Sequence, residues 1–124
     1  MQPQRFAVTP GQPAGIGPDL CLLLASQLQP HPLIAITSRD LLLERAAQLG
    51  VAVNLLEVAP GNWPDLAAPA GSLYVWDTPL QAKVVAGQLN TANAAFVLQT
   101  LTRAGQGCID GDFAGMITAP VHKG

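Results

Sequence analysis

Short apolar runs alternate with helix-forming runs through the first half of the chain. The runs at 5–9 and 33–37 have the length of strands, and the second is continuously apolar, as in buried strands of parallel sheets. Residues 19–28 and 39–50 have the length and apolar density of helices, and 51–58 predicts a further strand. This alternation of strands and helices with short connections predicts an α/β fold with a mostly parallel sheet.

Capping and helix-breaking residues predict where these two helices begin and end. Asp19 follows a proline and is expected to cap the first helix or to lie in its first turn, and Pro30 and Pro32 end it. Ser38 offers an N-cap for the second helix. Gly50 is its natural stop, because glycine readily adopts the left-handed conformation that follows a helix.

The second half of the chain is less regular. Residues 59–71 are rich in proline and glycine and predict a surface loop. The run 72–77 predicts a strand, which we expect to be antiparallel or peripheral because no helix directly precedes it. A last strand is expected within 112–120, which makes about five strands and three helices in all.

The third helix is predicted within residues 83–107. Thr91 and Asn93 are weaker helix formers and leave its first residue open, and Gly105 or Gly107 is expected to stop it. Its apolar side is expected to consist of Leu89, Ala92, Phe96, Leu98, Thr100 and Leu101.

Composition narrows the class of protein. The chain of 124 residues is one domain at most, with 49% hydrophobic and 11% charged residues, against about 25% charged in an average soluble domain. A chain with so few charged residues is expected to be mostly buried, either in a larger fold or against a partner. A net charge of −2 without a basic stripe argues against nucleic acid binding. No apolar run is long enough for a membrane helix and no signal peptide is recognisable, so the expected location is the cytoplasm.

Few side chains of the chain are obvious reactive groups. Cys21 and Cys108 are expected to be two buried free thiols, with a disulfide as the alternative. His31 lies between two prolines and is expected to be an exposed residue of a connection.

The loop at 9–19 holds three glycines and three prolines between a strand and a helix. In open α/β sheets, ligands bind at this position, where the next helix offers free N–H groups. Gly15 and Gly17 would allow a ligand to approach the backbone closely. The spacing fits neither the dinucleotide nor the P-loop fingerprint. A rigid crossover loop without a ligand is therefore an equal alternative.

Two longer motifs carry a resemblance to a known family. VTPGQPAGIGPDL at 8–20 and ITAPVHKG at 117–124, with AGQLNTANAAFVLQTL at 86–101 between them, resemble the 4-hydroxythreonine-4-phosphate dehydrogenases of pyridoxal phosphate biosynthesis. The GIGPD turn is also similar to that of isocitrate and isopropylmalate dehydrogenases, whose three-layer α/β sandwich the family shares. The resemblance implies that fold, incomplete in this chain, and makes Gly15, Ile16 and Gly17 candidates for cofactor binding.

The resemblance also implies a reaction. The family oxidises 4-phosphooxy-L-threonine at its secondary alcohol with NAD or NADP, and the resulting β-keto acid loses carbon dioxide. A divalent metal such as Zn, Mg or Co assists, and the full-length enzyme is expected to be a homodimer. This chain contains only two histidines, His31 and His122, so the metal ligands are expected outside it. His122 and Lys123 are candidate pocket residues; alternatively they cap the next helix and face solvent.

The resemblance implies that residues 1–124 are the amino-terminal part of a dehydrogenase, without the metal- and substrate-binding remainder. We expect the isolated chain to be inactive and poorly soluble. One alternative is a truncated, non-catalytic relative that binds a nucleotide through the first loop or pairs with another subunit through the helix at 88–104. A second alternative is an inert fragment.

Overall fold

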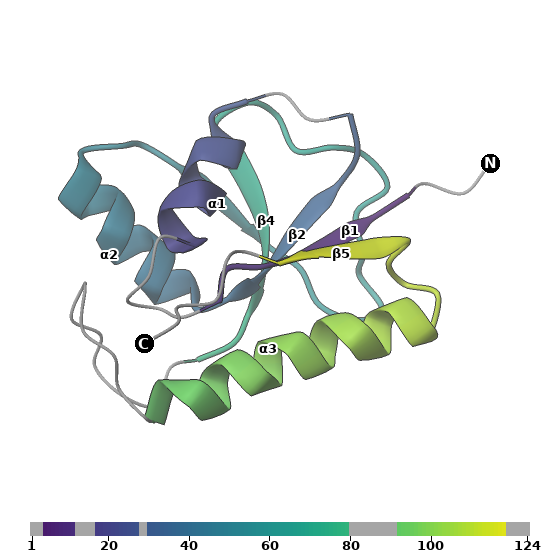
Figure 1. Cartoon of the computed structure of the whole chain (residues 1–124). Coiled ribbons are helices and arrows are strands. Elements are labelled where there is room, and N and C mark those ends of the chain that lie inside the picture. The colour runs from purple at the N-terminus through teal and green to yellow at the C-terminus, as the bar shows by residue number, and fades with distance from the viewer. Residues whose placement is uncertain (1–3, 12–16, 28–29, 80–91, 119–124) are drawn as a thin grey trace.

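The computed structural model describes residues 4–11, 17–27, 30–79 and 92–118. These residues form five strands and three helices (Figure 1), as the sequence predicts. In chain order they are β1 (Phe6–Thr9), α1 (Gly17–Ala25), β2 (Leu33–Thr37), α2 (Arg39–Leu49), β3 (Asn54–Glu57), β4 (Ser72–Asp77), α3 (Ala92–Ile109) and β5 (Gly115–Thr118).

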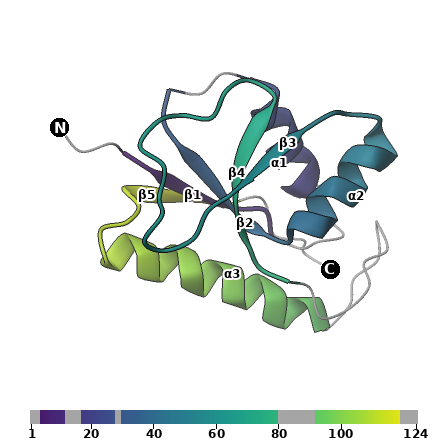
Figure 2. The same cartoon turned by 180° about the vertical axis from the view of Figure 1, so that it is seen from behind.

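The strands form one parallel sheet in the order β3-β4-β2-β1-β5. Figures 1 and 2 show α1 and α2 together on one side of this sheet and α3 alone on the other. The predicted three-layer α/β arrangement is therefore confirmed. Among the described residues, no helix is long and apolar enough to cross a membrane.

The core consists of two clusters, one on each face of the sheet. Side chains alternate between the faces along a strand, so the continuously apolar β2 supplies both clusters. Ala35 packs with Cys21 and Leu42 on the side of α1 and α2. Ile34 packs with Phe113 and other residues on the side of α3. The apolar composition of this strand thus follows from burial on both faces.

Helix α2 has the ends that the sequence predicts. The Ser38 side chain accepts a hydrogen bond from the Leu41 N–H at 3.1 Å, which satisfies one of the free donors of the first turn. Gly50 adopts a φ of 69° and closes the last turn through its own N–H. Helix α1 begins at Gly17, two residues earlier than predicted, so that Asp19 lies in its first turn.

The prediction for β4 was wrong. This strand is parallel to both of its neighbours, β3 and β2, and lies inside the sheet. A parallel connection needs a dozen or more residues but not a helix, and residues 58–71 are long enough. Within that loop, Trp63 contacts the rings of Trp76 and Phe113, with centroids 5.4 and 5.1 Å away, and thereby covers the sheet as a helix otherwise would.

Helix α3 also departs from the prediction, because it continues through Gly105 and Gly107 to Ile109. Gly107 is buried against the ring of Phe113, where a side chain would collide with that ring. The glycine therefore allows close packing inside the helix instead of ending it. Leu98 is 65% exposed and does not belong to the buried side of α3. Leu89 lies outside the described residues.

Two further expectations are corrected. His31 is half-buried rather than exposed, and its ring packs on that of Phe6 with centroids 5.5 Å apart. Both cysteines are free, as expected, but only Cys21 is buried, whereas Cys108 is half-buried. They belong to different core clusters on opposite faces of the sheet.

Candidate functional site

The carboxyl ends of the parallel strands meet at one edge of the sheet, and polar residues gather there. In the register of the sheet, Thr9 lies beside Thr118 and Thr37 beside Asp77. Strands β1, β2 and β5 thus each end on a threonine, and β4 ends on an aspartate followed by Thr78. This is the edge at which open α/β proteins bind their ligands. Sequence reasoning missed these residues, although the apolar runs that became β1, β2 and β5 visibly end on threonine.

Two of these hydroxyls are buried without a hydrogen-bond partner. Thr9 and Thr37 are each 1% exposed, and in the described part of the chain neither Oγ1 atom has a partner. The alternation of side chains places Thr9 on the face of α3 and Thr37 on the face of α1 and α2. The structure therefore offers two separate unsatisfied hydroxyls at this edge.

Arg103 of α3 is fixed beneath the end of β4. Its Nη1 donates to the Asp77 carbonyl oxygen at 3.0 Å and to Thr78 Oγ1 at 2.8 Å. The guanidinium carbon lies 4.5 Å from the ring centroid of Trp76, a cation–π geometry. These contacts hold a permanent positive charge close to the carboxyl edge.

The amino end of α2 is closed to a ligand. The Ser38 hydroxyl oxygen accepts from Leu41, and the Asp77 carboxylate accepts from the Arg39 N–H at 2.9 Å. An anion at this helix end would have to displace a carboxylate that is already bound there. The N–H groups of Arg39 and Leu41 therefore stabilise the helix end and are not available to a ligand.

Asp19, in the first turn of α1, is engaged by α2. Arg45 donates from Nε to Oδ1 at 2.5 Å and from Nη2 to Oδ2 at 3.0 Å. This hydrogen-bonded pair raises the pKa of Arg45 above its usual value. The Asp19 carboxylate thus joins the two helices.

Of the predicted site residues, only Gly17 lies within the described part. It is buried at the first position of α1, and a side chain there would overlap the carbonyl group of Pro10. The close approach of the first turn of α1 to Pro10 thus requires glycine at this position. Gly15, Ile16, His122 and Lys123 lie outside the described residues, and their roles stay predictions.

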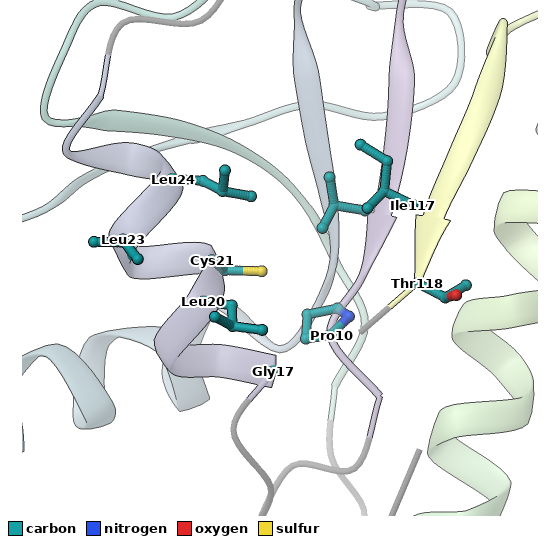
Figure 3. A pocket seen from close by; sticks show the side chains of 9 residues that line it. Pro10, Gly17, Leu20, Cys21, Leu23, Leu24, Ile117 and Thr118 are labelled. Atoms are coloured by element: carbon teal, nitrogen blue, oxygen red, sulfur yellow. The ribbon is translucent and has the colours of Figure 1, made fainter. Parts of the chain in front are cut away.

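A cavity of about 240 Å³ opens beside Gly17 (Figure 3). Cys21 and Leu24 on α1 face Ile117 on β5 across it. Burial raises the pKa of the Cys21 thiol to about 12. The thiol is consequently neutral at physiological pH and cannot act as a thiolate nucleophile. The described residues contain no group of three or more His, Cys, Asp or Glu side chains placed to hold a metal ion.

The parallel sheet with helices on both faces defines an open α/β protein, a class whose members bind ligands at the carboxyl edge of the sheet. Comparison with protein families gives the particular family. The model described as Pyridoxal phosphate biosynthetic protein PdxA matches residues 29–124, and the chain belongs to this family.

Individual relatives agree with this assignment. The chain is 83% identical over its whole length to a 4-hydroxythreonine-4-phosphate dehydrogenase of Pseudomonas putida, and 78% identical to that of Pseudomonas syringae pv. tomato. It spans 38% of the length of each of these curated relatives. The crystal structure of a 4-hydroxythreonine-4-phosphate dehydrogenase from Burkholderia phymatum superposes on 99% of this chain and 38% of its own, with a TM-score of 0.85 at 18% identity, and shows the same fold.

Proposed function

We propose that this chain is the amino-terminal part of a dehydrogenase that oxidises and decarboxylates 4-phosphooxy-L-threonine in pyridoxal phosphate biosynthesis. The observation that carries the proposal is the 83% identity, over all 124 residues, to a relative named for that activity. The chain spans 38% of that relative, so the activity belongs to the full-length protein and the isolated chain is inactive.

A nicotinamide cofactor, NAD or NADP, fits the residues at the carboxyl edge. Bound there, it would accept a hydride from the secondary alcohol of the substrate. Thr9 and Thr37 support this position, because a buried hydroxyl without a partner is costly unless something else satisfies it. Gly17 keeps the start of α1 close to the end of β1, and with Gly15 and Ile16 would form the cofactor side of the cleft. Arg103 adds a fixed positive charge near this edge.

Residues outside this chain are expected to supply the rest of the active site. A divalent metal, such as Zn, Mg or Co, would be bound there, together with most of the phosphorylated amino acid substrate. His122 and Lys123 would contribute to the substrate pocket. The full-length enzyme would act as a homodimer in the cytoplasm, without nucleic acid or membrane partners.

A chimera tests the proposal with this chain's own residues. These 124 residues replace the matching segment of the Pseudomonas putida relative, and formation of reduced nicotinamide is followed with 4-phosphooxy-L-threonine and a divalent metal. We expect turnover comparable to that of the parent enzyme. A folded chimera that forms no reduced nicotinamide, while the parent does, would refute the proposal.

Two matched variants of the chimera test the cofactor position. Replacing Thr9 by valine should weaken nicotinamide binding by up to about tenfold, the contribution of one neutral hydrogen bond. Thr100→Val is the control, because that buried hydroxyl already donates to the Val97 carbonyl oxygen at 2.7 Å. Equal binding by both variants would remove Thr9 from the cofactor site.

A second function, that of a non-catalytic subunit-interaction module, is favoured by one observation. Leu23 and Ile117 are 56% and 47% exposed although they line an apolar cavity. Such a surface suits a protein partner.

A further inference from the structure

The end of β4 is held by helices from both layers. The Asp77 carboxylate accepts a hydrogen bond from the Arg39 N–H, at the start of α2, at 2.9 Å. From α3, Arg103 Nη1 donates to the Asp77 carbonyl oxygen at 3.0 Å and to Thr78 Oγ1 at 2.8 Å. Thr78 is fully buried, so folding replaces the water around its hydroxyl with this bond. The end of β4 therefore connects α2 to α3.

Arg103 is the only charged residue of α3, and it does not point into solvent. The residue is half-buried, and its guanidinium carbon lies 4.5 Å from the ring centroid of Trp76. Trp76 packs against the core cluster on the α3 side of the sheet. A guanidinium that lies on an aromatic ring and donates to two oxygen atoms is held in one orientation. Arg103 is thus a fixed part of the carboxyl edge.

The contacts of Arg103 continue to Thr37, the last residue of β2. The Thr78 N–H donates to the Thr37 carbonyl oxygen at 2.8 Å, beyond the regular ladder between β2 and β4. The Thr37 side chain is 1% exposed, and its Oγ1 atom has no partner in the described part of the chain. Arg103 lies on the other side of the sheet and acts on Thr37 only through Thr78. The hydrogen bonds of Thr78 thus connect the guanidinium to the backbone that carries an unsatisfied hydroxyl.

We propose that Arg103 is a positioning residue for the nicotinamide cofactor, because through Thr78 it holds the Thr37 hydroxyl where the cofactor binds. The inference rests on the proposed function, which assigns Thr37 to the cofactor position. A hydrogen bond weakens steeply when its donor and acceptor are misaligned, so a displaced Thr37 would lose its bond to the cofactor. This bond serves the ground state and the transition state equally. Its loss should therefore raise the KM for the cofactor and leave kcat unchanged.

A double-mutant cycle in the full-length chimera tests this role. The Kd of NAD is measured by titration calorimetry, and kcat and KM are measured with 4-phosphooxy-L-threonine and a divalent metal. Arg103→Met should weaken NAD binding about three- to tenfold, the contribution of one neutral hydrogen bond, while kcat stays within about twofold. Thr78→Val keeps the β-branched shape and should weaken binding by the same factor. The double variant should bind no more weakly than either single variant, because both substitutions break the same contact.

Arg5→Met is the matched control. Arg5 also makes two hydrogen bonds, to the Pro64 carbonyl oxygen at 2.6 Å and to Asp65 Oδ1 at 2.8 Å. It precedes β1 and so lies at the amino edge of the sheet, away from the proposed cofactor position. A general loss of stability would affect both arginine variants alike, whereas we expect Arg5→Met to bind NAD like the unmodified chimera.

Three results would overturn the inference: unchanged NAD binding by Arg103→Met, equal weakening by Arg5→Met, or effects of Arg103→Met and Thr78→Val that multiply in the double variant. If Arg103→Met does not fold, Thr78→Val decides, because unchanged NAD binding by that variant overturns the inference as well. An unmodified chimera that binds no NAD refutes the proposed function and this inference with it. A chimera that binds NAD, with variants that bind it equally well, overturns the inference alone.

Discussion

Replacing Thr9 by valine should make the chain more stable. The side chain is 1% exposed, and its hydroxyl has no hydrogen-bond partner among the described residues. Water solvates this hydroxyl in the unfolded chain, and folding removes that solvation without replacing it. Valine has nearly the same shape and the same β-branch, which suits the end of β1. The substitution therefore removes an unfavourable contribution and leaves the packing in place.

The magnitude follows from the cost of an unsatisfied hydroxyl, about 1–3 kcal/mol in protein mutational data. Because the surroundings adjust in part, we expect the free energy of unfolding to rise by about 1–2 kcal/mol. A chain of 124 residues has an unfolding entropy of about 0.26 kcal/mol/K near its melting temperature. The gain corresponds to an increase of about 4–8 °C in that temperature.

Thermal unfolding followed by circular dichroism measures this change, and urea unfolding confirms it at constant temperature. Thr100→Val is again the control, because its hydroxyl is equally buried but donates to the Val97 carbonyl oxygen. That variant should lose about 1 kcal/mol. If Thr9→Val melts at the same temperature as the unmodified chain or below it, the Thr9 hydroxyl has a partner and the reasoning fails.

Three further substitutions test the packing of α3 and the buried thiol. Gly107→Ala should lower the free energy of unfolding by about 1–3 kcal/mol, since its methyl group would collide with Phe113. Gly105→Ala, which meets open space on the same helix, should raise it by about 0.5–1 kcal/mol; the opposite order in urea unfolding would contradict this account. Burial raises the pKa of Cys21 from 9.0 to about 12, so the unfolded chain loses this proton first. The free energy of unfolding should therefore fall above about pH 9, by up to about 1.4 kcal/mol per pH unit. Cys21→Ala should remove this part of the pH dependence. If the free energy of unfolding of that variant falls as steeply with pH as that of the unmodified chain, the Cys21 thiol is not its cause.

The first half of the fold was predictable from local signals. Strand β2 and helix α2 have the predicted bounds, because a continuously apolar run, an N-cap at Ser38 and a left-handed Gly50 all act within a few residues of chain. The position of β4 was not predictable in the same way. Its pairing with β2 and β3 depends on a loop whose Trp63 packs against Trp76 and Phe113.

The same distinction holds for glycine in α3. A glycine is a helix stop when the chain after it turns away, and sequence alone predicted that outcome for Gly107. The ring of Phe113 instead occupies the space that a side chain would need. The packing of residues beyond the helix therefore decides what this glycine does.

The candidate site also has a part that the sequence predicted and a part that only the structure revealed. The sequence by itself identified, through long motifs, the family that the comparisons confirm. Its candidate glycines in the loop at 9–19 stay predictions. Such motifs are contiguous, so they can be recognised without any fold. The row of threonines at the carboxyl edge and the cavity between α1 and β5 bring together elements far apart in the chain. Only the tertiary structure decided them, because strand order and helix placement determine which residues share an edge and which face stays bare.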